Sequence, residues 1–331
     1  MASIDTTSTE PIRRPFEGRR VHLGDVLLQG FAGAAAVGVV VIVGLIVWKL
    51  VDSADPAISK YGVGFVWHKV WNPVVGREAY GAASFLFGTA ITSFFALLIA
   101  TPLAIGIALF LTELAPRGIQ APVTALVEML AAVPSVVIGL WGILVLGPAL
   151  RTNIESWLHS AFGFIPLFGP PSASGASIFT AIIVLSIMIL PIVSSISREL
   201  FLGVPHELKE GALALGTTRW EMVRGVMFPY ARGGIAAALI LGLGRAMGEA
   251  IAVTQVIGGG VFIHWSLFGQ GDTLASKIAS EYQGATSNLE VASLIYLGLI
   301  LLMLSLVANL TAQWIVRRVE RRHGVVRGGR A

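Results

Sequence analysis

Cysteine is absent from this sequence, and charged residues are scarce. Only 13% of the 331 residues are Asp, Glu, Lys or Arg, whereas 55% are hydrophobic. Without cysteine, the chain has no disulfide bond, no thiol catalysis and no cysteine–metal cluster. The mean hydropathy of +0.79 is typical of a protein that crosses a membrane several times, and it excludes a water-soluble enzyme built around one core.

Signatures of nucleotide and metal chemistry are missing too. No G-x-x-x-x-G-K-[ST] segment occurs, so the chain has no P-loop for ATP. His206 and Glu207 begin an H-E-x-x-H pattern, but Glu210 occupies the fifth position, which rules out a zinc-protease helix. No Ser-His-Asp set or carboxylate pair stands in a polar domain. We therefore expect that this chain is not an enzyme and that it holds no cofactor and no metal.

Long apolar runs predict the architecture. About 20 apolar residues cover the ~30 Å hydrocarbon core of a bilayer, and six such runs make the expected fold an all-α integral membrane bundle. Residues 1–26 would form an amino-terminal arm, 27–316 the transmembrane domain and 317–331 a basic tail, with loops at 50–83, 147–175, 197–233 and 261–289. The predicted spans are 27–48, 84–111, 122–146, 177–196, 234–260 and 289–315.

Basic residues predict the orientation. The formal net charge is only +4, and a few clustered arginines do not indicate nucleic-acid binding. Cytoplasmic segments of membrane proteins are enriched in Lys and Arg, so we expect a multi-pass protein of the inner (cytoplasmic) membrane with both termini and the 197–233 loop in the cytoplasm. The basic residues assigned to that side are Arg13, Arg14, Arg19, Arg20, Arg117, Arg198, Lys209, Arg219, Arg224, Arg232, Arg317, Arg318, Arg321, Arg322, Arg327 and Arg330.

Two charged residues, Arg245 and Glu249, stand in the middle of the span at 234–260. A charge at the bilayer centre costs about 2.5–3.5 kcal/mol on insertion scales, so such residues usually face a cavity or a partner. Their i,i+4 spacing predicts that both lie on one helix face, beside Gly244 and Gly248, where another backbone could approach. One interpretation is an ion pair that only holds helices together. We favour the other, a pathway for a charged substrate.

The loop at 197–233 is too patterned for a simple connector. Pro205 suits a first helical position, Gly216 is a natural helix stop, and Thr217 or Thr218 can cap a second helix that we expect Pro229 to end. Two short helices at a glycine corner would form a compact knob that docks in a groove of another protein. Its apolar face would consist of Leu208, Ala212, Leu213 and Leu215.

The same loop resembles the EAA loop of bacterial ABC importer permeases. That motif reads Glu-Ala-Ala, three residues, Gly, nine residues, then Ile-x-Leu-Pro. In that family the loop forms the coupling helix, which sits in a groove of the ATP-hydrolysing subunit, and the resemblance implies this role for about residues 205–216. The matching positions are Glu210, Gly211, Ala212, Gly216, Val226, Phe228 and Pro229, with Gly211, Val226 and Phe228 departing from the motif residues.

Three further segments resemble the PstC-type subunit of phosphate ABC transporters. They are FVWHKVWNP with YGAASFLFGTAITS, AAVPSVVIGLWG at 131–142, and GLGRAMGEAIAV at 242–253. The resemblance implies the MetI-like permease fold and places Arg245 and Glu249 in substrate passage. It also implies a homologous PstA-type permease, two ATPase subunits that hold ATP and Mg²⁺, and an extracytoplasmic phosphate-binding protein as partners.

An oxyanion substrate agrees with the residues. The guanidinium of Arg245 keeps its charge and its planar fork matches phosphate oxygens, and Glu249 is suited to accept the proton that phosphate carries. The function expected is import of inorganic phosphate. Two alternatives stay open at this point: a permease for sulfate or molybdate, because an arginine at depth suits any oxyanion, and an ATP-independent secondary transporter, which would show inverted repeats.

Overall fold

The computed structural model describes residues 23–322. The predicted arm therefore lies almost wholly outside the described residues, as does the part of the predicted tail after Arg322. The described helices are α1 (Leu23–Tyr61), α2 (Ala83–Leu109), α3 (Arg117–Ala132), α4 (Ser135–Trp141), α5 (Gly147–Ala149), α6 (Ser156–Phe162), α7 (Ile178–Leu202), α8 (His206–Ala214), α9 (Arg219–Met222), α10 (Phe228–Gly248), α11 (Ile251–Val256), α12 (Leu274–Glu281) and α13 (Asn288–Arg322).

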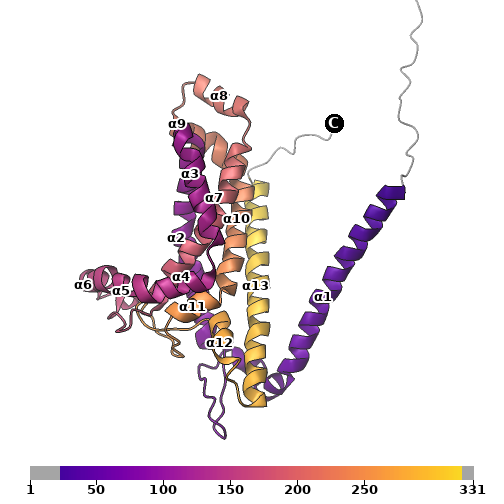
Figure 1. Ribbon diagram of the computed structural model, residues 1–331, viewed down its shortest axis with the longest axis vertical. Coiled ribbons are helices and arrows are strands. Elements are labelled where there is room, and N and C mark those ends of the chain that lie inside the picture. The colour runs from indigo at the N-terminus through magenta and orange to yellow at the C-terminus, as the bar shows by residue number, and fades with distance from the viewer. Residues whose placement is uncertain (1–22, 323–331) are drawn as a thin grey trace, which may run out of the picture. The chain divides into compact units, whose positions relative to one another are not determined.

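The chain divides into two units, residues 1–49 and 50–331. In the first unit, the described residues form the apolar beginning of α1. In the second, α2, α7, α10 and α13 run alongside one another, with α8 and α9 at one end and α11 and α12 at the other (Figure 1). Within residues 23–322, six helical stretches are long and apolar enough to cross a membrane, which confirms the predicted number. They are Val26–Val66, Ala83–Leu114, Ser135–Phe162, Ile178–Leu202, Arg219–Gly248 and Asn288–Arg318.

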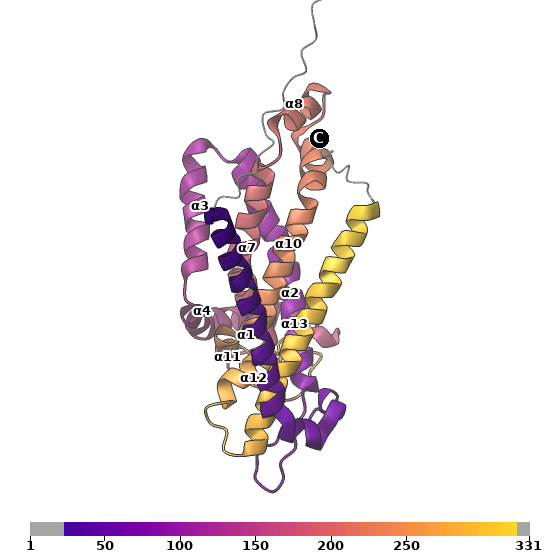
Figure 2. The same cartoon turned by 90° about the vertical axis from the view of Figure 1, so that its right-hand side faces the viewer.

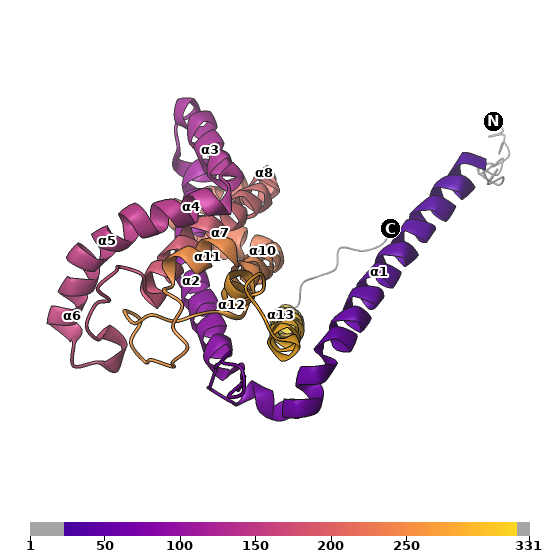
Figure 3. The same ribbon diagram turned by 60° about the horizontal axis from the view of Figure 1, so that its bottom comes forward.

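The predicted third span, 122–146, is wrong in its bounds. α3 ends at Ala132, and Val133 is extended (φ −66°, ψ 128°) because the residue before a proline, here Pro134, is disfavoured in the helical conformation. A new helical run starts at Ser135 and continues through α4, α5 and α6 into the region predicted as a loop. Figure 3 shows this curved run, whose π-helical turns at Gly142–Leu146 and Leu150–Glu155 separate the helices.

α7 is the most buried of the six stretches. Against it lies a stripe of alanines on α2, namely Ala96, Ala100 and Ala104, all fully buried. Small residues let two helices approach closely, and the Ser186 hydroxyl donates to the Ala96 carbonyl at 3.2 Å across this contact. α10 also meets α7, at Gly242, where an added Cβ would lie 2.8 Å from the Ile189 side chain.

The segment predicted as a loop at 261–289 contains the helix α12. Its amino terminus packs against α2, where the Thr89 hydroxyl accepts a hydrogen bond from the Leu274 amide at 3.0 Å. One residue earlier, a Cβ added to Gly88 would overlap the backbone carbonyl of Asp272. The loop backbone therefore reaches α2 only because Gly88 has no side chain.

This contact makes a test of the packing. Gly88→Ala would force the Asp272 backbone away, and overpacking of this kind typically costs about 1–3 kcal/mol. Gly106→Ala is the matched control, since Gly106 lies on the same helix with open space around it and alanine is the better helix former. The melting temperature of the detergent-purified protein should fall for Gly88→Ala and should stay equal or rise for Gly106→Ala. Equal melting temperatures for the two variants would contradict the packing described.

Candidate functional site

Arg245 lies in the last turn of α10, and the helix ends three residues later at Gly248. Glu249 is extended (φ −73°, ψ 112°), and α11 begins at Ile251. The prediction that Arg245 and Glu249 share one face of a continuous helix is therefore wrong. A broken backbone at membrane depth is tolerated where protein encloses it, and Ala252, Val253 and Val256 of α11 are buried. Residue spacing alone does not reveal that enclosure.

Arg245 and Glu249 do not form the ion pair that was one interpretation of their spacing. Among the residues that the structure describes, Arg245 makes no hydrogen bond and no salt bridge, and its side chain is exposed. Glu249 is half-buried and accepts only a long hydrogen bond from the Ala252 amide, at 3.4 Å. The guanidinium of Arg245 thus keeps all its donors available for a ligand.

Arg245 lines a groove of about 950 Å³ between α10 and α13. Figure 2 shows these two helices diverging toward the end of the unit that carries α8. From α13, Asn309, Gln313 and Arg317 line the same groove, and sequence reasoning missed all three. The available signal was their i,i+4,i+8 spacing at the end of an apolar span. The remaining lining residues are Ile192, Gly233, Ala237, Ile240, Leu241, Gly244 and Val316.

The glycines flanking Arg245 do not mark a close helix contact within this chain. An added Cβ at Gly244 would just reach the Asn309 side chain, at 4.0 Å, and one at Gly248 would meet nothing within 4 Å. Close approach occurs instead at Gly234 and Gly242, on the side of α10 that packs against α7. Gly244 therefore leaves room in the groove beside Arg245.

At the other end of α10, the 197–233 segment forms the predicted knob. Pro205 precedes α8, Gly216 adopts φ +86° as a helix stop, and Thr218 caps α9 in a capping box with Glu221. The prediction that Pro229 ends the second helix is wrong: α9 passes through a π-helical turn, Val223–Met227, directly into α10. Pro229 directly follows this π-helical turn, as the second residue of α10, and a local π-helical adjustment of this kind accommodates the missing N–H of a proline.

The apolar residues of α8 are largely unburied. Leu208, Leu213 and Leu215 are exposed, Leu215 by 88%, whereas Ala212 packs against the cluster that includes Phe201 and Met227. Of the other residues that match the EAA motif, Glu210, Gly211 and Gly216 are also exposed. α8 therefore presents an apolar and acidic surface that no described part of this chain covers.

Lys209 anchors α8 to the rest of the unit. Its ammonium lies 2.7 Å from the Glu113 carboxylate and donates to the Phe201 carbonyl at 3.3 Å. Glu113 belongs to the π-helical turn Phe110–Leu114 between α2 and α3. Both side chains are largely buried, with 11% and 19% of their surface exposed. This pair ties the knob to the end of α2.

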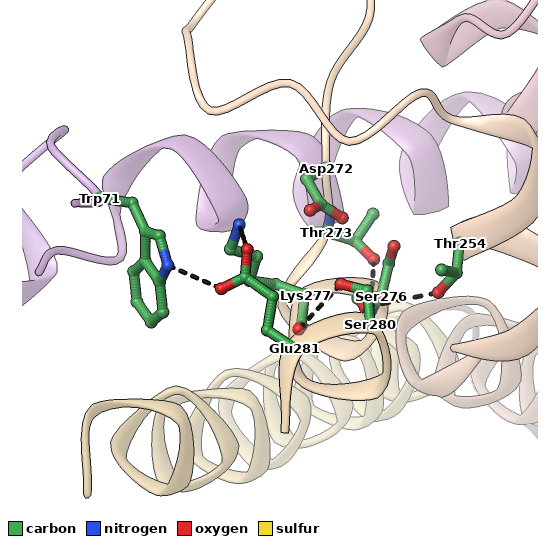
Figure 4. A network of polar contacts seen from close by, with 8 residues as sticks. All are labelled: Trp71, Thr254, Asp272, Thr273, Ser276, Lys277, Ser280 and Glu281. Atoms are coloured by element: carbon green, nitrogen blue, oxygen red, sulfur yellow. Dashed lines mark hydrogen bonds and ion pairs between the residues drawn. The ribbon is translucent and has the colours of Figure 1, made fainter. Parts of the chain in front are cut away.

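A second polar network lies at the α12 end of the unit (Figure 4). The indole N–H of Trp71 donates to Glu281 at 2.7 Å, and the Lys277 ammonium pairs with the same carboxylate. Lys277 also lies over the rings of Trp71 and Phe85. Nearby, burial raises the pKa of Asp272 to about 6. The network joins the 62–82 segment, α2 and α12.

Metal binding finds no support in the described part of the chain. Within residues 23–322, no three His, Asp or Glu side chains come close enough together to hold an ion. The groove offers two guanidinium groups and two amides. The guanidinium groups favour an oxyanion and repel a cation.

Known proteins similar to this chain identify its family. Residues 100–322 match the family "Binding-protein-dependent transport system inner membrane component". The chain belongs to this family. It is 42% identical over 311 residues to the phosphate transport system permease protein PstC of Mesorhizobium japonicum, covering 92% of this chain and 94% of that one. It is 41% identical over 314 residues to the permease protein PstC 2 of Mycobacterium tuberculosis, covering 92% and 97%.

A solved structure supports the permease fold. The bacterial alginate ABC transporter in complex with its alginate-bound periplasmic protein contains a chain that matches with a TM-score of 0.61 and 18% identity, covering 89% of this chain and 97% of that chain. At this identity the likeness concerns the fold alone. Together with the family match and the six apolar helices, it confirms the expected membrane fold of an ABC importer permease.

The Lys209–Glu113 pair provides a test of how α8 is held. Breaking a buried pair costs about 3–5 kcal/mol, and partial exposure reduces this to roughly 1–3 kcal/mol here. Lys209→Met and Glu113→Leu should each lower the melting temperature in detergent, while the double variant Lys209→Met/Glu113→Leu should recover most of the loss. Glu199→Gln is the control because Glu199 is 70% exposed in its pair with Arg198. Additive losses in the double variant would refute the anchor.

The raised pKa of Asp272 predicts a pH dependence. Its folded pKa of about 6 exceeds the ordinary value of 3.8. Ionisation of this carboxylate therefore destabilises the folded state: the full destabilisation is present above about pH 6, and it disappears as the pH falls toward 4. Asp272→Asn should therefore raise the melting temperature relative to wild type at pH 7.5 more than at pH 5. Asp55→Asn, the same change at an exposed site, controls for the charge. An equal difference at both pH values would argue against burial as the cause.

Proposed function

We propose that this chain is a permease subunit of an ATP-driven importer that moves inorganic phosphate across the cytoplasmic membrane. The observation that carries the proposal is Arg245: an exposed guanidinium without a partner, at the deep end of a groove between two membrane-spanning helices. The relatives named as phosphate transport permeases, at 42% and 41% identity, support phosphate as the oxyanion. Glu249, at the helix break, is assigned to accept the proton that phosphate carries.

The knob is assigned to energy coupling. α8 exposes Leu208, Leu213 and Leu215 together with Glu210, a surface suited to a groove on an ATPase subunit. Two such subunits would hold ATP and Mg²⁺, a homologous PstA-type permease would complete the membrane part, and an extracytoplasmic binding protein would deliver phosphate. In this arrangement both termini and α8 face the cytoplasm.

The coupling step follows from the way α8 is attached. α9 continues through a π-helical turn into α10, and Lys209 ties α8 to the end of α2. A displacement of α8 by the ATPases would therefore be carried to both helices, and α10 bears Arg245. Transport requires that the anion be released as well as held, and movement of α10 relative to α13 would change the width of the groove.

Arg245 is the residue to test. In the importer reconstituted with its ATPase, partner permease and binding protein, Arg245→Ala should lower phosphate uptake at least tenfold, since the lone cation at the deep end is lost. Arg245→Lys should keep part of the activity, because it preserves the charge but not the planar fork. ATP hydrolysis stimulated by the loaded binding protein should persist in both variants, which separates loss of passage from loss of assembly.

Three outcomes would overturn the proposal. Normal phosphate uptake by an assembled Arg245→Ala importer would remove Arg245 from the path. If excess sulfate or molybdate suppressed the uptake of labelled phosphate as strongly as unlabelled phosphate does, the chain would be assigned to another oxyanion. Uptake by the chain alone, without ATPase and insensitive to vanadate, would return it to the class of secondary transporters.

A further inference from the structure

Three polar side chains of α13 form a line along the groove that holds Arg245. Asn309, Gln313 and Arg317 follow one another at i,i+4,i+8, so they stand on one face of the helix, about 12 Å from first to last at 1.5 Å per residue. All three line the groove. In an otherwise apolar helix, such a line marks a face that meets water or a polar ligand and not lipid.

The line begins beside Arg245 and leads away from it. α10 and α13 are antiparallel, so Asn309 lies near Gly244, and the groove continues along α10 to Gly233 while it continues along α13 to Arg317. This second end is the one that carries α8 (Figures 1 and 2). The groove thus has one guanidinium at its deep end and another near its opening.

The charges in the groove all have one sign. None of the described residues that line it is Asp or Glu, so neither Arg245 nor Arg317 has an acidic neighbour there. Elsewhere in the described chain, the largely buried cations Lys209 and Lys277 are each paired with a carboxylate. Two guanidinium groups without an acidic partner in the same groove attract an anion.

Asn309, at the Arg245 end of the line, has a hydrogen-bonding atom without a partner. Its Oδ1 is buried and has no hydrogen-bond partner, an arrangement that is costly unless a ligand or water completes it. An amide offers both donors and an acceptor. It can therefore donate to an ionised oxygen of an oxyanion and accept from a protonated one, and hydrogen phosphate carries both.

We propose that Asn309, Gln313 and Arg317 form a second oxyanion site, which receives the anion from Arg245 and releases it at the α8 end of the groove. The inference rests on the proposed function. A single strong cation would hold a phosphate too tightly for turnover, whereas two weaker sites in series let the anion enter and leave. Arg317 lowers the barrier to departure from Arg245, and the amides bridge the apolar stretch between them.

The test compares Arg317→Gln with Arg318→Gln in the complete importer in proteoliposomes. Arg318 is the matched control because it is the adjacent arginine, stacks on the Trp314 ring and does not line the groove. With labelled phosphate, Arg317→Gln should lower phosphate taken up per ATP hydrolysed at least fivefold, and Arg318→Gln less than twofold. Equal effects of the two variants would overturn the proposal.

Asn309 gives a second and independent measurement. Asn309→Asp keeps the shape of the side chain and adds a negative charge to the groove, so it should reduce phosphate uptake at least tenfold at pH 7.5. Asn309→Ser, which is smaller but neutral, should reduce uptake less. Uptake is expressed per folded importer, because burial of a carboxylate also destabilises the protein; equal uptake per folded importer by the aspartate and serine variants would refute the second site.

Two further arms separate the sources of the ligand and the two proposals. An anionic phospholipid headgroup offers similar chemistry to Arg317, so the assay is repeated in vesicles of zwitterionic phosphatidylcholine alone, which carry no net negative charge; disappearance of the Arg317→Gln defect there would assign Arg317 to anionic lipid. Wild-type importer that takes up no phosphate refutes the proposed function itself. If the wild-type importer takes up phosphate and the Arg317→Gln variant takes up as much per ATP hydrolysed, only the second site is refuted.

Discussion

The packing of α7 against α2 and α10 is the interaction on which the rest of the second unit depends. The bilayer cannot satisfy free backbone groups, yet this chain leaves the helical conformation at Val133 and again at Glu249. Both breaks are possible because α4 and α11, which follow them, pack against each other and α7. The alanine stripe of α2 and Gly242 of α10 bring the helices close enough to provide that enclosure.

Within this frame, ion pairing distinguishes Lys209 and Lys277 from Arg245. Lys209 and Lys277 are largely buried and each meets a carboxylate, because removal of a charge from water is costly unless a partner compensates. The Lys209–Glu113 pair joins α8 to the α2–α3 turn. The Lys277–Glu281 pair lies within α12, and its carboxylate reaches the 62–82 segment by accepting a hydrogen bond from the Trp71 indole. Arg245 has no partner and faces a groove. An unpaired cation at this depth is consistent with a ligand that comes and goes.

Much of the fold could be predicted from local patterns. Hydropathy found six spans because a membrane helix needs a continuous apolar run, and Pro205, Gly216 and Thr218 predicted the knob because caps and stops are local interactions. The failures share a cause. Pro134 interrupts an apolar run that appears continuous by hydropathy. Pro229 does not end the helix, because a π-helical turn before it keeps the helix continuous. α12 is too short and too polar to be detected as an apolar segment.

The sequence by itself determined that this chain is a membrane protein with six apolar helical stretches, and it singled out Arg245 and Glu249 as charged residues within a long apolar run. These properties depend on composition and on neighbours within a few residues. Only the tertiary structure decided that α10 stops before Glu249, that Arg245 stays unpaired, and that Asn309, Gln313 and Arg317 share its groove. Residues more than 60 positions apart in the chain meet there because α10 and α13 run antiparallel, and no local pattern encodes which faces of two helices meet.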